Sequence, residues 1–153
     1  MFLWWLQFSG LVPIRLTSEW HAHEMLYGYT FAVIAGFLLT SVGNRTGSDT
    51  ASGAPLLLLF TLWLLARLFN IVGQYSIAGA SDLAFMLLFD LFIFVPIIKA
   101  KQWRQFAIMI VIVMLITANG LYYAGQRALV DKGNYFGNYS GFYVVVAAFF
   151  VLI

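Results

Sequence analysis

The sequence contains no cysteine and very little charge. The absence of cysteine excludes structural disulfides, cysteine-ligated zinc, iron–sulfur clusters and c-type haem attachment. Charged residues make up only 9% of the 153 residues, whereas hydrophobic residues make up 63%. The resulting mean hydropathy of +0.91 lies far outside the globular range and predicts a protein embedded in a lipid bilayer. The net charge of +2 is too small to indicate a nucleic-acid partner.

Long apolar runs separated by polar turns predict the membrane topology. A helix that spans a bilayer needs roughly 20 consecutive apolar residues. Four stretches meet this requirement, namely residues 20–42, 55–73, 80–98 and 106–124. The apolar stretches 2–14 and 142–153 are each too short to cross. We therefore expect an all-α, polytopic transmembrane helix bundle, with four complete spans and a partial helix at each end.

The two short end stretches predict that further helices accompany this chain. A half-helix that ends inside lipid leaves backbone polar groups without partners. We therefore expect residues 1–153 to form a single transmembrane helical domain that is an incomplete part of a longer protein. Its partners would be lipid and the remaining helices of that protein. The first residues are not a signal peptide, because they lack a basic region and a cleavage site.

The distribution of lysine and arginine predicts the orientation. The 99–104 loop carries three basic residues, the densest group in the chain. Because cytoplasmic loops are enriched in lysine and arginine, we expect this loop inside the cell. Alternation of the spans then puts the 43–53 loop inside as well. The start of the 20–42 span and the 125–139 loop would lie outside.

The only two histidines, His21 and His23, flank one alanine at the mouth of the first complete span, and Glu24 follows them directly. Ionisable residues at membrane depth are uncommon, and neutral imidazole is a good ligand for iron and copper. The pair therefore predicts ligation of a metal ion or haem iron. In a regular helix the two rings point nearly apart, so they would serve different centres. They could share one centre only if the helix begins after His23.

Polar side chains on four predicted helices lie at a similar depth, towards the outer side. They are His21, His23, Glu24, Arg67, Asn70, Gln74, Asp82, Asn119 and Tyr122. Such groups usually face a partner or a cavity inside the bundle, which predicts a shared site. Arg67 shares one helix face with Trp63, Asn70 and Gln74. It would neutralise a carboxylate or a haem propionate. Glu24 lies one turn from His21 and is expected to accept a hydrogen bond from that imidazole and orient it. Asp82 and Asn119 are expected to support the ligands in the same way.

Several segments resemble the NnrS family. Residues 20–29, which read WHAHEMLYGY, and residues 34–40, which read IAGFLLT, carry the most specific part of this resemblance. The segments LLARL at 64–68 and DLAF at 82–85 are also similar, so the resemblance covers about residues 15–124. The chain departs from the family where it has GNRTG at 43–47 in place of the usual Pro-Asn-Trp-Thr-Gly.

The resemblance implies a function that composition and spacing do not. Members of the family are bacterial inner-membrane proteins of about twelve helices that contain haem and copper. They are linked to denitrification and to tolerance of nitric oxide. By this resemblance His21 and His23 are the candidate haem or copper ligands. Arg67 is a further candidate for haem binding, because its charge could neutralise a propionate. The resemblance identifies no catalytic residue.

Two other classes remain open from the residues alone. A cytochrome b-like electron-transfer subunit would need histidine pairs on two facing helices, and only one helix here carries histidine. A membrane transporter or channel would use Asp82, Asp90 and Arg67 to line a polar path. A Soret band in the visible spectrum would exclude a pure transporter.

Overall fold

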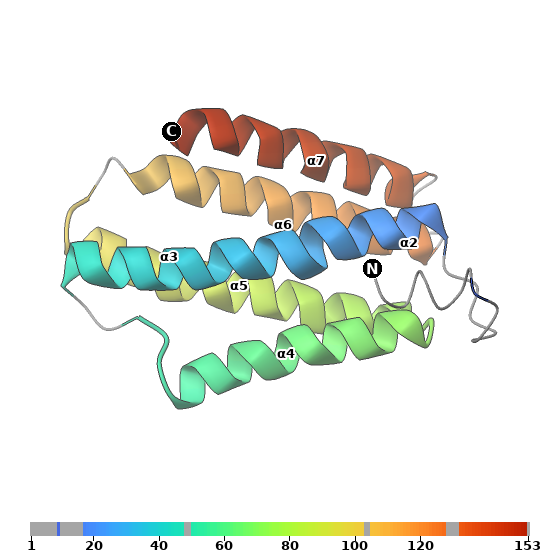
Figure 1. Ribbon diagram of the computed structural model, residues 1–153, viewed down its shortest axis with the longest axis horizontal. Helices are drawn as coiled ribbons and strands as arrows, with labels where there is room; N and C mark the ends of the chain where they lie inside the picture. The colour runs from blue at the N-terminus through green and yellow to red at the C-terminus, as the bar shows by residue number, and fades with distance from the viewer. Residues whose placement is uncertain (1–8, 10–16, 48–49, 103–104, 128–131, 153) are drawn as a thin grey trace.

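The computed structural model describes Ser9 and residues 17–47, 50–102, 105–127 and 132–152, and within these residues the chain forms helices and turns with no strand. The helices run side by side along one axis (Figure 1). In chain order they are α2 (Ser18–His23), the π-helix η1 (Glu24–Thr30), α3 (Phe31–Thr46), α4 (Ala54–Ile71), α5 (Tyr75–Lys99), α6 (Phe106–Gln126) and α7 (Gly133–Leu152).

The predicted spans are confirmed. Four helical stretches of the described chain are long and apolar enough to cross a membrane: Ser18–Thr46, Ala54–Ile71, Tyr75–Lys99 and Phe106–Gln126. The first of them joins α2, η1 and α3 into one continuous rod of 29 residues. The chain is therefore an all-α, multi-pass membrane protein. The expected short helix over 2–14 lies outside the described residues.

The last helix differs from the prediction. We expected a polar loop over 125–139 and a partial helix from residue 142, but α7 begins at Gly133 and contains 20 residues. The polar character of this stretch comes from asparagine, serine and tyrosine on a helix rather than from a loop. Glycines at 133, 137 and 141 recur every fourth residue, which is the spacing of close helix contacts in membranes.

Two of these glycines, Gly133 and Gly137, allow α7 to lie directly against α6, as Figure 1 shows, whereas Gly141 faces Tyr27 of η1. A Cβ atom at Gly137 would lie 2.5 Å from the backbone nitrogen of Tyr122 and 2.6 Å from the carbonyl oxygen of Ala118. At Gly133 it would lie 2.7 Å from the carbonyl oxygen of Leu121. The backbones are thus too close for any side chain between them, and the glycine spacing sets the position of α7.

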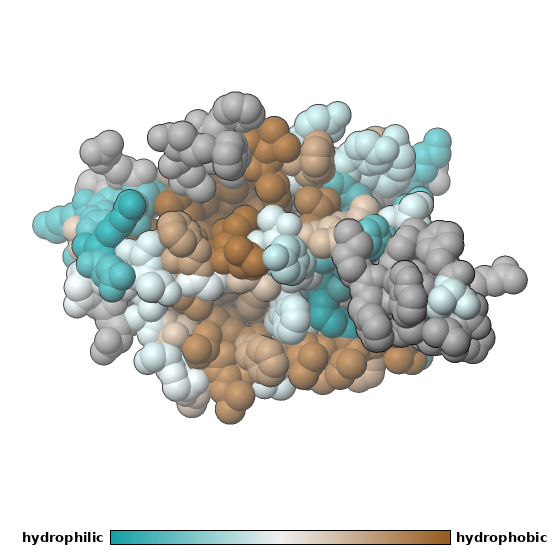
Figure 2. All heavy atoms as spheres, in the orientation of Figure 1, coloured by the Kyte–Doolittle hydropathy of each residue, from teal (hydrophilic) through white to brown (hydrophobic). Residues whose placement is uncertain are grey.

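The central helix of the bundle is α5, which packs against α3, α4 and α6. Its buried apolar side chains include Phe89, Ile93 and Ile97, each 0% exposed, and the Phe89 ring meets Phe31 edge-on at 5.4 Å. The outer face of α4 is lined with exposed leucines, as expected for contact with lipid. Figure 2 shows apolar surface across the middle of the molecule and hydrophilic residues towards its ends.

Candidate functional site

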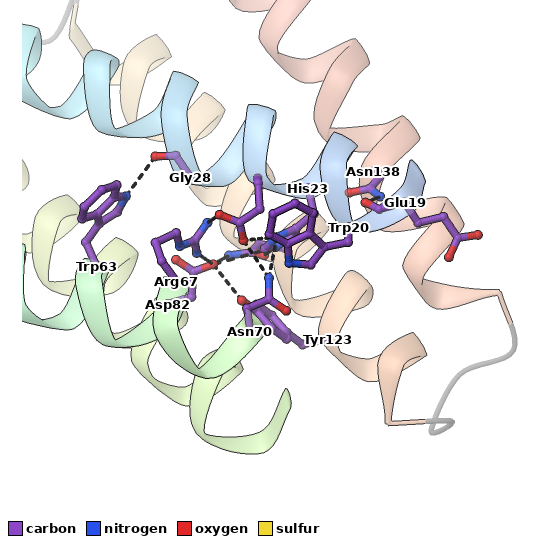
Figure 3. Close-up of polar contacts among 12 residues, drawn as sticks. Glu19, Trp20, His23, Gly28, Trp63, Arg67, Asn70, Asp82, Tyr123 and Asn138 are labelled. Carbon is purple, nitrogen blue, oxygen red and sulfur yellow. Dashed lines mark hydrogen bonds and ion pairs between the residues drawn. The ribbon is translucent and has the colours of Figure 1, made fainter. Parts of the chain in front are cut away.

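A buried group of polar side chains lies where the α2–η1 segment, α4, α5 and α6 meet (Figure 3). We call this group the polar cluster, and its members are His23, Glu24, Arg67, Asn70, Asp82, Asn119 and Tyr123. His23, Asp82 and Asn119 are each 0% exposed. Such burial in a membrane bundle requires that every charge meets a partner.

One arginine joins the two carboxylates of the polar cluster. Arg67 Nη1 lies 3.2 Å from Glu24 Oε2, and Arg67 Nη2 lies 2.6 Å from Asp82 Oδ2. The Asn70 side chain donates a further hydrogen bond of 2.7 Å to Glu24 Oε1. The polar cluster thus combines two carboxyl groups, one guanidinium and one imidazole.

The imidazole of His23 is held on both sides. The amide of Asn119 donates from Nδ2 to Asp82 Oδ2 at 3.0 Å, so its Oδ1 faces the histidine. His23 Nε2 therefore donates to Asn119 Oδ1, at 2.8 Å. On the opposite side, His23 Nδ1 lies 3.4 Å from Asn70 Nδ2 and 3.5 Å from Glu24 Oε1.

Three tyrosines enclose the same imidazole. The ring of Tyr122 stacks on His23 with 3.8 Å between centroids and 17° between planes. The rings of Tyr27 and Tyr123 lie 5.0 and 5.1 Å away. Tyr123 also donates to Asp82 Oδ2 at 3.2 Å. This packing leaves no space for a porphyrin beside His23, so the position suits a small ligand only.

The π-helix η1 and its glycine shape the approach to the polar cluster. A Cβ atom at Gly28 would lie 2.7 Å from Arg67 Nη1 and 2.9 Å from Glu24 Oε2, so a larger residue would displace this ion pair. The wide turns of a π-helix leave carbonyl groups that need other partners. Trp63 Nε1 donates to the Gly28 carbonyl at 2.9 Å, and the Thr30 hydroxyl donates to the Met25 carbonyl at 2.8 Å.

His21 lies apart from the polar cluster. It is half-buried on α2, whereas His23 is fully buried. Met25, about one turn after His21, lines a groove of about 620 Å³ between the α2–η1 segment and α7. Tyr139 and Phe142 of α7 form the aromatic wall of this groove. The two histidines thus have different surroundings, as the helical spacing predicts.

Only some of the polar residues predicted to lie at one membrane depth contact one another. His23, Glu24, Arg67, Asn70, Asp82 and Asn119 come together, and Tyr122 packs on the imidazole. Gln74 is exposed at the turn before α5, and Asp90 is half-buried two turns further along α5. We expected Glu24 to support His21, but its carboxylate contacts His23, Arg67 and Asn70.

Sequence reasoning missed two members of this region, Met86 and Tyr123. Met86 is 0% exposed, and its sulfur lies 3.1 Å from Asn119 Nδ2. It follows Asp82 by four residues, so helical spacing put both on one face of α5. Nothing distinguished Met86 from an ordinary core residue. Tyr123 was overlooked beside Tyr122, although adjacent residues on a helix can both face the interior.

A metal centre built only from histidine and acidic side chains is not assembled in the described part of the chain. No three side chains of the histidine, cysteine, aspartate or glutamate type are grouped there to hold a metal ion. Within the described residues, the further donor atoms beside His23 and Asp82 are the thioether of Met86 and the amide of Asn119.

Comparison with known proteins identifies the family. A family model described as NnrS protein matches residues 1–153. The chain belongs to the NnrS family. No curated protein and no solved structure matches it. In this NnrS family member, the WHAHE run supplies both an imidazole and a carboxylate, His23 and Glu24, to the polar cluster.

Proposed function

We propose that this NnrS family member is part of a haem- and copper-containing protein of the bacterial inner membrane that acts in the response to nitric oxide during denitrification. The polar cluster carries the proposal. It places a fully buried imidazole among two carboxylates and an arginine inside a membrane bundle. Burial of ionisable groups in a bilayer costs free energy, and such groups usually mark a functional site.

We propose His23 as the copper ligand and His21 as the haem ligand. Stacking on Tyr122 supports a small ion at His23, because a porphyrin would have to displace that ring. The half-buried position of His21 supports a flat cofactor there, because part of its ring is accessible, and Met25, one turn further along, lines a groove with an aromatic wall. Haem bound at His21 would supply an iron centre able to bind a diatomic gas.

We propose that Arg67 mainly neutralises carboxylates. It already pairs with Glu24 and Asp82, at 3.2 and 2.6 Å. A haem propionate would have to compete with these two partners. Contact between Arg67 and haem therefore stays a prediction that depends on how the cofactor approaches the polar cluster.

The visible absorption spectrum and the copper content of the purified full-length protein test this function. We expect a Soret band and bound copper in the same preparation. Haem without copper would instead favour a cytochrome b-like electron-transfer subunit. A protein with neither cofactor, purified from cells supplied with both, would contradict the proposal and favour a transporter.

The orientation can be tested separately, because the sequence contains no cysteine. Ser18 and Lys101 are both exposed, at opposite ends of the helical rods. We expect Ser18→Cys to react with a membrane-impermeant thiol reagent in cells whose outer membrane is permeabilised. Lys101→Cys should react only after the inner membrane is broken. The reverse pattern would overturn the inside assignment of the 99–104 loop.

A further inference from the structure

The amide of Asn119 contacts three possible metal-ligand atoms from two helices, His23 on α2 and Asp82 and Met86 on α5. His23 Nε2 lies 2.8 Å from Asn119 Oδ1, whereas Asp82 Oδ2 and Met86 Sδ lie 3.0 and 3.1 Å from Asn119 Nδ2. All four residues are 0% exposed. The donors therefore converge on one small polar group that is sealed inside the bundle.

The chemistry of these donors selects the kind of ion. Thioether sulfur is a soft ligand that favours monovalent copper, and imidazole suits copper as well. Hard cations such as magnesium and calcium prefer sets composed entirely of oxygen. The combination of His23, Met86 and Asp82 is thus better matched to a soft transition-metal ion than to a hard one.

The distances also suit a single ion. His23 Nε2 and Asp82 Oδ2 are 3.8 Å apart. Nitrogen and oxygen ligands that each lie roughly 2 Å from one metal ion are separated by roughly 3.3–4 Å. These two donors are therefore already spaced to share an ion. Asn119 must move from between them, and the ion would share Asp82 with Arg67 and Tyr123, which contact Oδ2 at 2.6 and 3.2 Å.

The charge of the polar cluster points in the same direction. Two acidic side chains, Glu24 and Asp82, share one guanidinium, that of Arg67. The acidic side chains outnumber the guanidinium, which favours binding of a cation. A second oxygen of the same carboxylate, Asp82 Oδ1, is buried without a hydrogen-bond partner and offers a further ligand atom.

The surroundings of His23 match those of a metal-bound histidine. A ligating imidazole normally directs its other nitrogen towards a carboxylate or a carbonyl group. His23 Nδ1 faces Glu24 Oε1 at 3.5 Å. On metal binding, the proton would leave Nε2, and Nδ1 would carry the imidazole proton towards Glu24.

From these observations we propose a monovalent copper site formed by His23, Met86 and Asp82. The amide of Asn119 lies between these three donors. On copper binding this side chain would rotate away or would bind the ion through Oδ1. This inference rests on the proposed copper-binding function and goes beyond it, because it names a methionine and an aspartate as ligands.

The test compares Met86→Leu with Met109→Leu in the full-length protein. Both methionines are buried, and the substitution nearly conserves volume, so both variants should fold. Copper(I) affinity would be measured against a chromophoric chelator under reducing conditions. Loss of a residue that only supports a metal ligand typically weakens metal binding by roughly 10–100-fold. Because Met86→Leu removes a ligand itself, we expect its copper(I) affinity to fall by at least this factor. Met109→Leu should leave the affinity unchanged.

X-ray absorption at the copper edge gives a second readout. We expect a sulfur neighbour of copper in the unchanged protein and in Met109→Leu, and its loss in Met86→Leu. Equal affinity and an unchanged sulfur neighbour in Met86→Leu would overturn this inference while leaving the proposed function intact. If Met86→Leu failed to fold, the absence of sulfur around copper in the unchanged protein would overturn it. Absence of both haem and copper from the unchanged protein would instead contradict the proposed function.

Discussion

The two halves of this helix bundle are held together by different interactions. In the half around Phe31, Phe89 and Ile93, apolar side chains pack tightly, and loss of a methyl group removes only local contacts. In the other half, Arg67 bridges two carboxylates and His23 is hydrogen-bonded to Asn119. Removing one partner there leaves a buried charge without compensation.

The difference teaches where the bundle is adaptable and where it is specific. An apolar core tolerates exchanges between hydrophobic residues of similar volume. A buried polar network is satisfied only as a complete set, and it fixes the positions of its members. The free-energy cost of removing these charged groups from water therefore offsets most of the stability that their contacts provide. The polar cluster nevertheless holds an imidazole and two carboxylates in one arrangement suited to binding.

The largest expected effect comes from breaking the ion pairs. Arg67→Leu should destabilise the protein by about 3–5 kcal/mol, because the fully buried Asp82 carboxyl group would lose its positively charged partner. Ile93→Val, in the apolar half, should cost only about 0.5–1.5 kcal/mol. Unfolding in detergent, followed by circular dichroism, would compare them. Equal losses in the two variants would show that the halves do not differ as described.

A second comparison uses two glycines. Gly137→Ala would place a Cβ atom 2.5 Å from the Tyr122 backbone and should force α6 and α7 apart, at a cost of about 1–3 kcal/mol. Gly36→Ala meets nothing within 4 Å and should stabilise α3 by roughly 0.5–1 kcal/mol. The same unfolding assay applies. A Gly137→Ala protein as stable as the Gly36→Ala protein would refute the close contact.

The smallest effect tests the π-helix. Trp63→Phe keeps an aromatic ring but removes the hydrogen bond to the Gly28 carbonyl, which should cost about 1 kcal/mol. Trp20→Phe is the control, because it makes the same change where the indole N–H has no hydrogen-bond partner among the described residues. If both changes cost the same, the indole N–H does not stabilise η1.

Much of the polar cluster was predictable from the sequence, because the depth of a residue in a membrane follows from its place along a span. Position along the spans predicted that four residues lie at one membrane depth, namely Glu24, Arg67, Asp82 and Asn119. The structure joins all four through hydrogen bonds and ion pairs. The 3.6-residue period likewise predicted that Arg67 and Asn70 share a face of α4.

The rotation of each helix about its own axis was not predictable in the same way. It depends on tertiary packing, so the regular period assigned Glu24 to His21, whereas the structure turns it towards His23. The π-helix changes the period within this span and had no sequence signal. The start of α7 did have one, since glycines four residues apart, Gly133 and Gly137, indicate close helix packing rather than a loop.

The most direct test of the separate roles of the two histidines is the haem and copper content of His21→Ala and His23→Ala in the full-length protein. We expect His21→Ala to lose haem, or to shift its spectrum strongly, while it retains copper. His23→Ala should lose copper and retain haem. If the haem and copper contents fall together in both variants, the two histidines serve one site. The assignment of haem to His21 and copper to His23 is then wrong.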